Sequence, residues 1–168
     1  LLNYHDRLED AFTVAHELGH SMHSFYSQKH QPQVYSDYSI FNAEIASTTN
    51  EALLVNHMLK VTTEREQRLF LLDFYIDSIR NTFYRQTLFA EFEMTIHAAA
   101  EQGKTLTADD LDEVYGGLVQ KYYGPDFTID EYKSAEWSRI PHFYRNFYVY
   151  TYATGYSAAA AFAKRILE

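Results

Sequence analysis

The sequence contains no cysteine, so it can form neither a disulfide framework nor a thiolate metal site. Any metal must therefore be held by histidine and carboxylate side chains, and the absence of cysteine fits a reducing compartment. Basic residues are also scarce, since 14 Lys and Arg stand against 23 Asp and Glu, which gives a formal net charge of −9. This acidic balance argues against nucleic acid or an anionic membrane surface as the partner.

No run of about 18 apolar residues is present, so we expect no membrane span. The amino terminus has neither the basic region nor the apolar stretch of a signal peptide, and it lacks an initial Met, which indicates a piece of a longer chain. With only three prolines and six glycines, most segments follow the helical period, and no alternating strand pattern stands out. We predict an all-α fold in a single domain over residues 1–168.

The expected helices are separated by recognisable start and stop signals. The first ends before Pro32, because proline cannot continue a helix and restricts the residue before it. Thr63–Glu66 and Thr107–Asp110 match helix-capping patterns, and Gly103 and Gly124 match helix ends. The helices are expected over residues 9–29, 39–61, 63–102 with room for an interruption, 107–123 and 144–167, with an irregular stretch over 125–141.

Residues 16 to 20 form the pattern His-Glu-x-x-His within the first expected helix. Side chains four residues apart lie on one helix face, about 6 Å apart along the axis, so His16 and His20 can converge on one zinc ion. Glu17 is offset from His16 by about 100°, which places it beside a metal-bound water rather than on the metal. Zinc lowers the pKa of that water toward about 7, and Glu17 would take its proton as the general base. The alternative is a helix that carries the pattern by chance.

A third ligand would complete such a site. A third histidine in the longer pattern His-Glu-x-x-His-x-x-Gly-x-x-His is excluded, because position 26 is Tyr. His23 lies about 10 Å along the axis from His16, so we expect a structural role for it. Glu44, 28 residues after His16, is flanked by small and apolar residues that would let its helix pack closely on the first, and a metal would partner its charge; a solvated acid is the alternative. Glu51 is either a hydrogen-bond partner of a ligating histidine or a surface acid.

Four segments together resemble the oligoendopeptidase F branch of the thimet oligopeptidase family: AFTVAHELGHSMHSFYS, YSIFNAEIASTTNEALL, RQTLFAEFE and RIPHFYRNFYVYTYATGYSAA. The resemblance implies a helical, zincin-type catalytic domain that uses zinc to hydrolyse short unstructured peptides in the cytoplasm. It also implies His16, His20 and Glu44 as metal ligands and Glu17 as the base. Members of this family are much longer, with an N-terminal helical region that forms the other wall of a deep channel, so the chain resembles their C-terminal catalytic part.

A second segment, Ile140–Tyr156, carries candidate donors for the oxyanion that forms during peptide hydrolysis. Tyrosines recur there every four residues, at 144, 148, 152 and 156. In relatives a histidine and one or more tyrosines of this region face the zinc site from a flexible loop, and by that resemblance we favour His142, Tyr148 and Tyr152. Other branches have several glycines after the histidine, whereas residues 145–147 here are Arg-Asn-Phe, which predicts a stiffer loop. An aromatic helix face packed into the core is the alternative for each tyrosine.

Two other functions fit parts of the pattern. Ferritin-like di-metal proteins need two Glu-x-x-His motifs, and Glu93 and His97 fail to supply the second because they are four residues apart. A catalytically incompetent zinc-binding or peptide-binding helical fragment is the other alternative, and the intact Glu17 argues against it. We therefore expect a zinc metalloendopeptidase that acts on short peptides, with no nucleic-acid or membrane partner and with its oligomeric state open.

Overall fold

The computed structural model describes residues 3–168, and these residues form α-helices, short 3₁₀ and π segments and connecting loops, without a strand. The predicted all-α fold is therefore confirmed. Among the described helices, none combines the length and apolar character that a membrane crossing needs. The helices divide into two compact units, one of Leu1–Ile79 with Thr154–Glu168 and one of Arg80–Ala153, which are described separately. The single domain expected over residues 1–168 stays a prediction.

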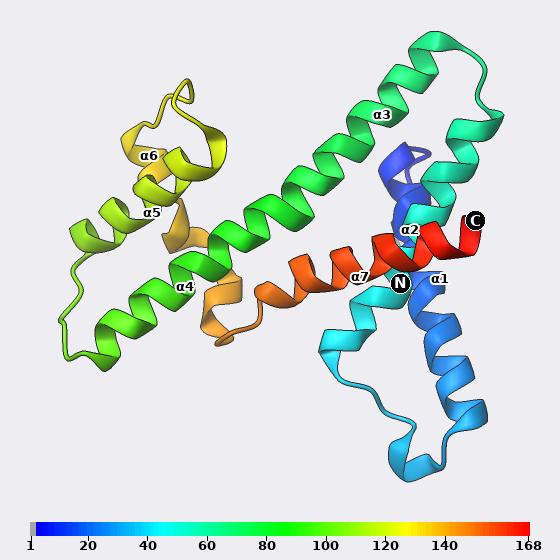
Figure 1. The fold of residues 1–168 in the computed structure, drawn as a ribbon, viewed down its shortest axis with the longest axis horizontal. Coiled ribbons are helices and arrows are strands. Elements are labelled where there is room, and N and C mark those ends of the chain that lie inside the picture. Colours follow the sequence, from blue (N-terminus) through cyan, green and yellow to red (C-terminus); the bar gives the residue numbers. More distant parts are fainter. Residues whose placement is uncertain (1–2) are drawn as a thin grey trace. The chain divides into compact units, whose positions relative to one another are not determined.

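The first unit is built on a pair of helices joined by a turn that covers residues 31–39 (Figure 1). Two serines of the first helix fasten this turn: the Ser27 hydroxyl donates to the Ser36 carbonyl at 2.6 Å, and the Ser24 hydroxyl lies 2.7 Å from that of Tyr38. The elements of this unit are α1 (Leu8–His30), a 3₁₀ turn (Gln33–Tyr35), α2 (Ile40–Val61), α3 (Arg65–Ile79) and, from Thr154 onward, α7 (Tyr150–Leu167).

Helices α1 and α2 pack in unusually close contact around Gly19. A Cβ atom added there would lie 2.5 Å from the Cα of Ser47 and 2.9 Å from the carbonyl oxygen of Ala46, closer than real Cβ atoms approach other atoms. The side-chain amide of Asn50 also donates to the Ala15 carbonyl at 2.6 Å, which ties the two helices together. The predicted close packing of the His-Glu-x-x-His helix on the Glu-bearing helix is thus confirmed, and it fixes the register between the two.

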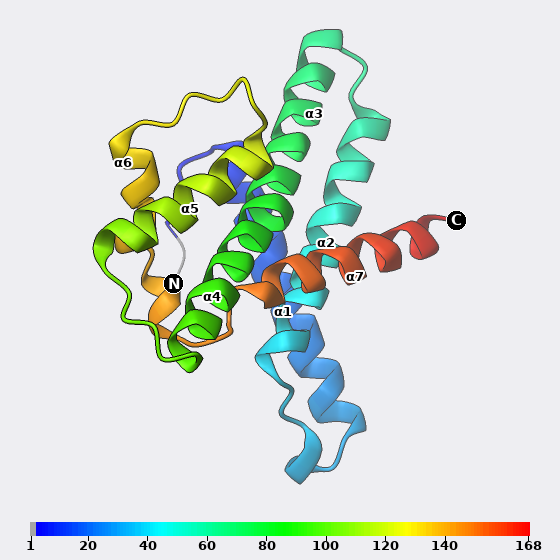
Figure 2. The same cartoon turned by 60° about the vertical axis from the view of Figure 1, so that its left-hand side comes forward.

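The second unit packs α4 and α5 side by side, as both ribbon views show (Figures 1 and 2). Its core combines aliphatic and aromatic side chains, with Phe92 and Tyr115 in edge-to-face contact at 5.3 Å between ring centroids. Helix α5 begins with the predicted capping box at Thr107 and Asp110 and ends just before Gly124, whose φ is +88°. The elements are a π turn (Arg80–Tyr84), α4 (Arg85–Glu101), α5 (Ala108–Tyr123), α6 (Glu131–Ser134), and 3₁₀ turns at Ala135–Arg139 and Pro141–Tyr144.

A buried carboxylate, Glu136, joins several elements of the second unit. It accepts hydrogen bonds from Arg85 at 2.7 Å, from Lys133 and Arg139 at 2.6 Å each, and from the Tyr115 hydroxyl at 3.0 Å. Burial by itself would raise the pKa of Glu136, but the hydrogen bond from Lys133 and the charge of Arg85 outweigh it and hold that pKa below its usual range. The charged form of Glu136 therefore contributes to the stability of this unit.

The last expected helix, residues 144–167, is wrong at its start, because α7 begins only at Tyr150. Pro141 opens a 3₁₀ turn, Arg145 is extended, and Phe147 adopts a left-handed conformation with φ +53°. The N–H of Phe147 donates at 2.8 Å to the side chain of Glu93 instead of joining a helix. This bond spans 54 positions of sequence, so local periodicity could not reveal it.

Candidate metal centre

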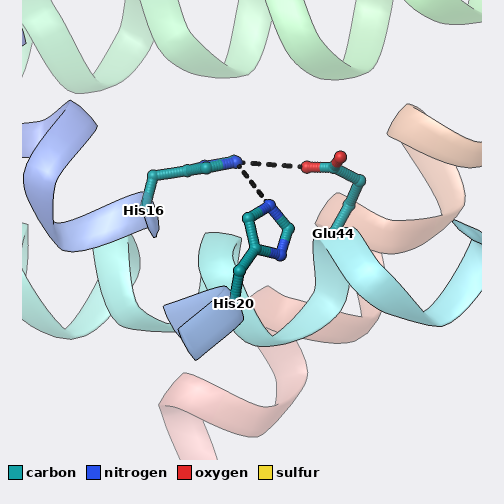
Figure 3. A group of neighbouring side chains, drawn as sticks. All are labelled: His16, His20 and Glu44. Atoms are coloured by element: carbon teal, nitrogen blue, oxygen red, sulfur yellow. Dashed lines mark hydrogen bonds and ion pairs between the residues drawn. The ribbon is translucent and has the colours of Figure 1, made fainter. Parts of the chain in front are cut away.

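Three side chains of the first unit converge at the contact between α1 and α2. His16 and His20 project from α1 and Glu44 from α2, and Figure 3 shows them pointing toward one another. The two Nε2 atoms lie 3.1 Å apart, and the Nε2 of His16 lies 3.4 Å from Oε2 of Glu44. One ligand atom from each residue lies within 4.8 Å of the other two, and all three residues are half-buried. The structure therefore brings the three predicted metal ligands together.

The spacing and chemistry of these atoms fit a divalent cation such as zinc. Tetrahedral zinc with bonds of about 2.0–2.2 Å holds its ligand atoms about 3.3–3.6 Å apart. The observed separations of 3.1 and 3.4 Å are close to that spacing. Two imidazole nitrogens and a carboxylate oxygen are also a donor set that zinc accepts. Such electron-rich atoms repel one another at this distance unless a proton or a cation lies among them.

A second carboxylate on α2 orients one of the imidazoles. Oε1 of Glu51 lies 2.6 Å from Nδ1 of His16. In the tautomer that carries the proton on Nδ1, His16 donates to Glu51 and directs the lone pair of Nε2 toward His20 and Glu44. Of the two roles that the sequence left open for Glu51, the structure shows the hydrogen bond to a histidine.

The two carboxylates also set the electrostatics of the site. The hydrogen bond to Glu44, followed by that to Glu51, raises the pKa of His16 to about 10, and burial opposes this only in part. The hydrogen bond to His16 in turn lowers the pKa of Glu44. Around neutral pH a proton therefore occupies this cluster when no cation does, and a metal ion competes with that proton for the same lone pairs.

The other candidates on α1 lie outside this cluster. Glu17 follows His16 directly and is exposed to solvent. His23 stacks on Tyr38, with ring centroids 3.8 Å apart and an angle of 15° between the planes. That contact agrees with the structural role expected for His23.

A cavity of about 290 Å³ in the first unit lies beside His16 and Glu51. Apolar side chains, including Phe12 and Phe74, form much of its wall, and Tyr156 reaches it from α7. Burial, together with the neighbouring Tyr75, raises the pKa of Tyr156. The sequence predicted no such position for Tyr156, and its membership of the four-residue tyrosine series was the only signal for it.

His142, Tyr148 and Tyr152 form a cluster of their own within the second unit. The ring of His142 lies parallel to that of Tyr148 at 6.1 Å and edge-on to that of Tyr152 at 5.9 Å. The two tyrosine hydroxyls are 2.9 Å apart, and the guanidinium of Arg145 lies 4.6 Å from the centre of the Tyr148 ring. The structure thus brings the three predicted oxyanion donors together, although only Tyr152 lies on α7. Their roles stay predictions.

Comparison with known proteins places this geometry in a family. The model of Peptidase family M3 matches residues 1–168. Oligopeptidase PepF of Bacillus subtilis is 52% identical over 168 residues, which are all of this chain and 25% of that protein. The chromosomal oligoendopeptidase F of Lactococcus lactis subsp. cremoris is 48% identical over 168 residues, again all of this chain and 28% of that protein.

Solved structures agree with the sequence relatives. The crystal structure of oligoendopeptidase-F from Enterococcus faecium matches with a TM-score of 0.81 and 46% identity, over 95% of this chain and 28% of that one. A structure from Chlamydophila abortus matches with a TM-score of 0.90 and 51% identity, over 99% of this chain and 28% of that one. The chain therefore spans about a quarter of the length of the relatives it matches. By sequence and by structure, the chain belongs to Peptidase family M3.

Proposed function

We propose that the chain carries the catalytic centre of a zinc metalloendopeptidase that hydrolyses peptide bonds of short peptides. The observation that carries this proposal is the convergence of His16 Nε2, His20 Nε2 and Glu44 Oε2, with Glu51 behind His16. The names of the relatives, oligopeptidase and oligoendopeptidase F, support short peptides as the substrate class. The cytoplasmic location implied by the resemblance stays a prediction.

Each residue of the proposed centre has a distinct task. His16, His20 and Glu44 hold the metal, and Glu51 keeps Nε2 of His16 directed toward it. When bound, a zinc ion supplies Lewis acidity, which lowers the pKa of water and polarises a peptide carbonyl. Glu17, exposed next to His16 on α1, accepts the proton of the attacking water and delivers it to the leaving amine.

His142, Tyr148 and Tyr152 are the proposed donors to the oxyanion. Imidazole N–H and phenol O–H groups suit this task, since pre-oriented donors stabilise the negative charge that develops in the transition state. Their mutual contacts support the proposal, because a ring held by two neighbours needs little reorganisation when the charge forms.

The test of the proposed function separates metal binding from proton transfer. In the full-length protein, Glu17→Gln is expected to keep its zinc content and its Tm while kcat on a quenched fluorescent peptide falls about 10²–10⁴-fold, the usual contribution of an acid–base group. Glu113→Gln, an exposed glutamate on α5, is the matched control and should leave kcat unchanged. Loss of zinc from Glu17→Gln would make Glu17 a ligand, and full activity would remove it from the mechanism.

A further inference from the structure

Glu93 and His97, the pair that fails as a second metal motif, both contact the same residue of the second unit. Glu93 is only 3% exposed, and its Oε1 accepts a hydrogen bond from the N–H of Phe147 at 2.8 Å. The ring of His97 lies 4.7 Å from that of Phe147. The two residues are one turn apart on α4, so together they form a clamp on Phe147, with Glu93 on its backbone and His97 on its ring.

Phe147 needs such support because its backbone is strained. Its φ of +53° lies in the left-handed region, which disfavours a residue with a Cβ by about 1–2 kcal/mol. A conformation of this kind persists only where its surroundings stabilise it. Glu93 supplies that stabilisation, because its buried side-chain oxygen accepts the hydrogen bond from the Phe147 N–H.

The clamped residue directly precedes Tyr148. The ring of Tyr148 lies parallel to that of His142, and its hydroxyl is 2.9 Å from the hydroxyl of Tyr152. A change of Phe147 to a right-handed or extended conformation would redirect the chain at the next residue and move Tyr148 away from both partners. The backbone at Phe147 therefore determines where the Tyr148 hydroxyl lies.

We propose that Glu93, assisted by His97, is a positioning residue for the reaction: it holds Phe147 so that Tyr148 stays aligned with His142 and Tyr152. This inference rests on the proposed function, since it assumes that Tyr148 donates to the oxyanion. Glu93 touches no reacting group and acts only through the backbone of Phe147. In the sequence, Glu93 was considered only as part of a second metal motif, which was excluded. The structure supports a positioning role for its side chain instead.

The first experiment measures the clamp itself in the full-length protein, without reference to activity. Amide hydrogen exchange at Phe147 is expected to accelerate about tenfold in Glu93→Ala, the factor that corresponds to the loss of one hydrogen bond. Glu93→Gln keeps an oxygen acceptor and should restore protection. Tyr115→Phe removes the hydrogen bond to Glu136 in the same unit, so it should lower Tm without changing exchange at Phe147. Unchanged exchange in Glu93→Ala would overturn the inference.

The second experiment is a double-mutant cycle that combines Glu93→Ala with Tyr148→Phe. Its readouts are kcat and KM, measured at constant zinc content. Glu93→Ala is expected to lower kcat at least about tenfold with KM little changed, and to add almost nothing in the Tyr148→Phe background. Glu93→Gln should restore kcat. Where Glu93→Ala folds too poorly to assay, His97→Leu supplies the same cycle with a smaller expected loss, about threefold.

The outcomes of the cycle separate the two proposals. If Tyr148→Phe lowers kcat but neither Glu93→Ala nor His97→Leu does, the positioning inference is overturned and the proposed function stands. If the losses from Glu93→Ala and Tyr148→Phe simply add, Glu93 acts on something other than Tyr148, and the inference is again overturned. If Tyr148→Phe alone leaves kcat unchanged, the donor role of Tyr148 fails, and the positioning role fails with it.

Discussion

The close approach of α1 and α2 at Gly19 makes a single added methyl group a sharp test of the metal centre. In Gly19→Ala the new Cβ would lie 2.5 Å from the Cα of Ser47 and 2.9 Å from its nitrogen. Ordinary carbon contacts are about 3.5–4.0 Å, so the helices must separate by about 1 Å. Neither neighbouring atom belongs to a side chain that could rotate away. Since His16 and His20 lie on α1 and Glu44 on α2, the same separation pulls the ligands apart.

Two opposing terms decide the stability of Gly19→Ala. Alanine is favoured over glycine inside a helix by about 1 kcal/mol, whereas overpacking costs about 1–3 kcal/mol. The net loss of stability is thus small, about 0–2 kcal/mol. Metal binding should suffer more, because ligand atoms must stay within about 0.2 Å of their proper distances. We expect zinc affinity to fall at least about tenfold, as occurs when a ligand's support is lost.

Chelator competition and thermal unfolding of the full-length protein, with and without zinc, measure both effects. Gly117→Ala on α5 is the matched control, since an added Cβ there meets no atom within 4 Å. That variant should gain up to about 1 kcal/mol of stability and keep its zinc affinity. If Gly19→Ala behaves like Gly117→Ala in both assays, the contact at Gly19 does not set the ligand geometry.

Three further predictions address other parts of the structure. Glu51→Gln should weaken zinc binding about tenfold in chelator competition, because it removes the charge that supports Nδ1 of His16; unchanged affinity would contradict that role. Glu136→Gln should lower the stability of the second unit by about 2–3 kcal/mol at neutral pH, because three cations lose their carboxylate. The pKa of Glu136 is lower in the folded than in the unfolded protein. The difference in unfolding free energy between wild type and Glu136→Gln is therefore complete above the unfolded pKa and shrinks as pH falls through the folded pKa. A difference that grew toward low pH in urea unfolding would contradict this expectation. Tyr148→Phe and Tyr152→Phe should each lower kcat at least about tenfold with zinc retained, and near-normal kcat in both would leave His142 as the only donor candidate of the segment.

The sequence predicted most helix boundaries because local signals set them. The first helix was expected over 9–29 and spans Leu8–His30, and the fourth was expected over 107–123 and spans Ala108–Tyr123. The signals that set these ends act only on neighbouring residues, so they can be recognised in the sequence. They are Pro32, the capping box at Thr107, and Gly124, which adopts a positive φ. The start of α7 depends instead on the distant bond between Glu93 and Phe147, and there the prediction was wrong.

The candidate site divides in the same way. The spacing of His16 and His20 is a property of one helix, so it follows from the sequence directly. The position of Glu44 opposite them depends on the register of two helices, which the contact at Gly19 sets and which small residues in α2 only suggested. The cavity beside His16 depends on several helices at once, so the sequence did not predict it. For Tyr156, which helps to line it, the only sequence signal was the four-residue tyrosine series.

The most direct test of the account is a crystal structure of the full-length protein with zinc, with anomalous scattering recorded at the zinc absorption edge. We predict one strong anomalous peak at about 2.0–2.2 Å from Nε2 of His16, Nε2 of His20 and a carboxylate oxygen of Glu44. Glu17 should lie outside bonding distance of that peak. The absence of a peak among these three side chains, or a peak ligated by Glu17 or His23 in place of Glu44, would contradict the proposed centre.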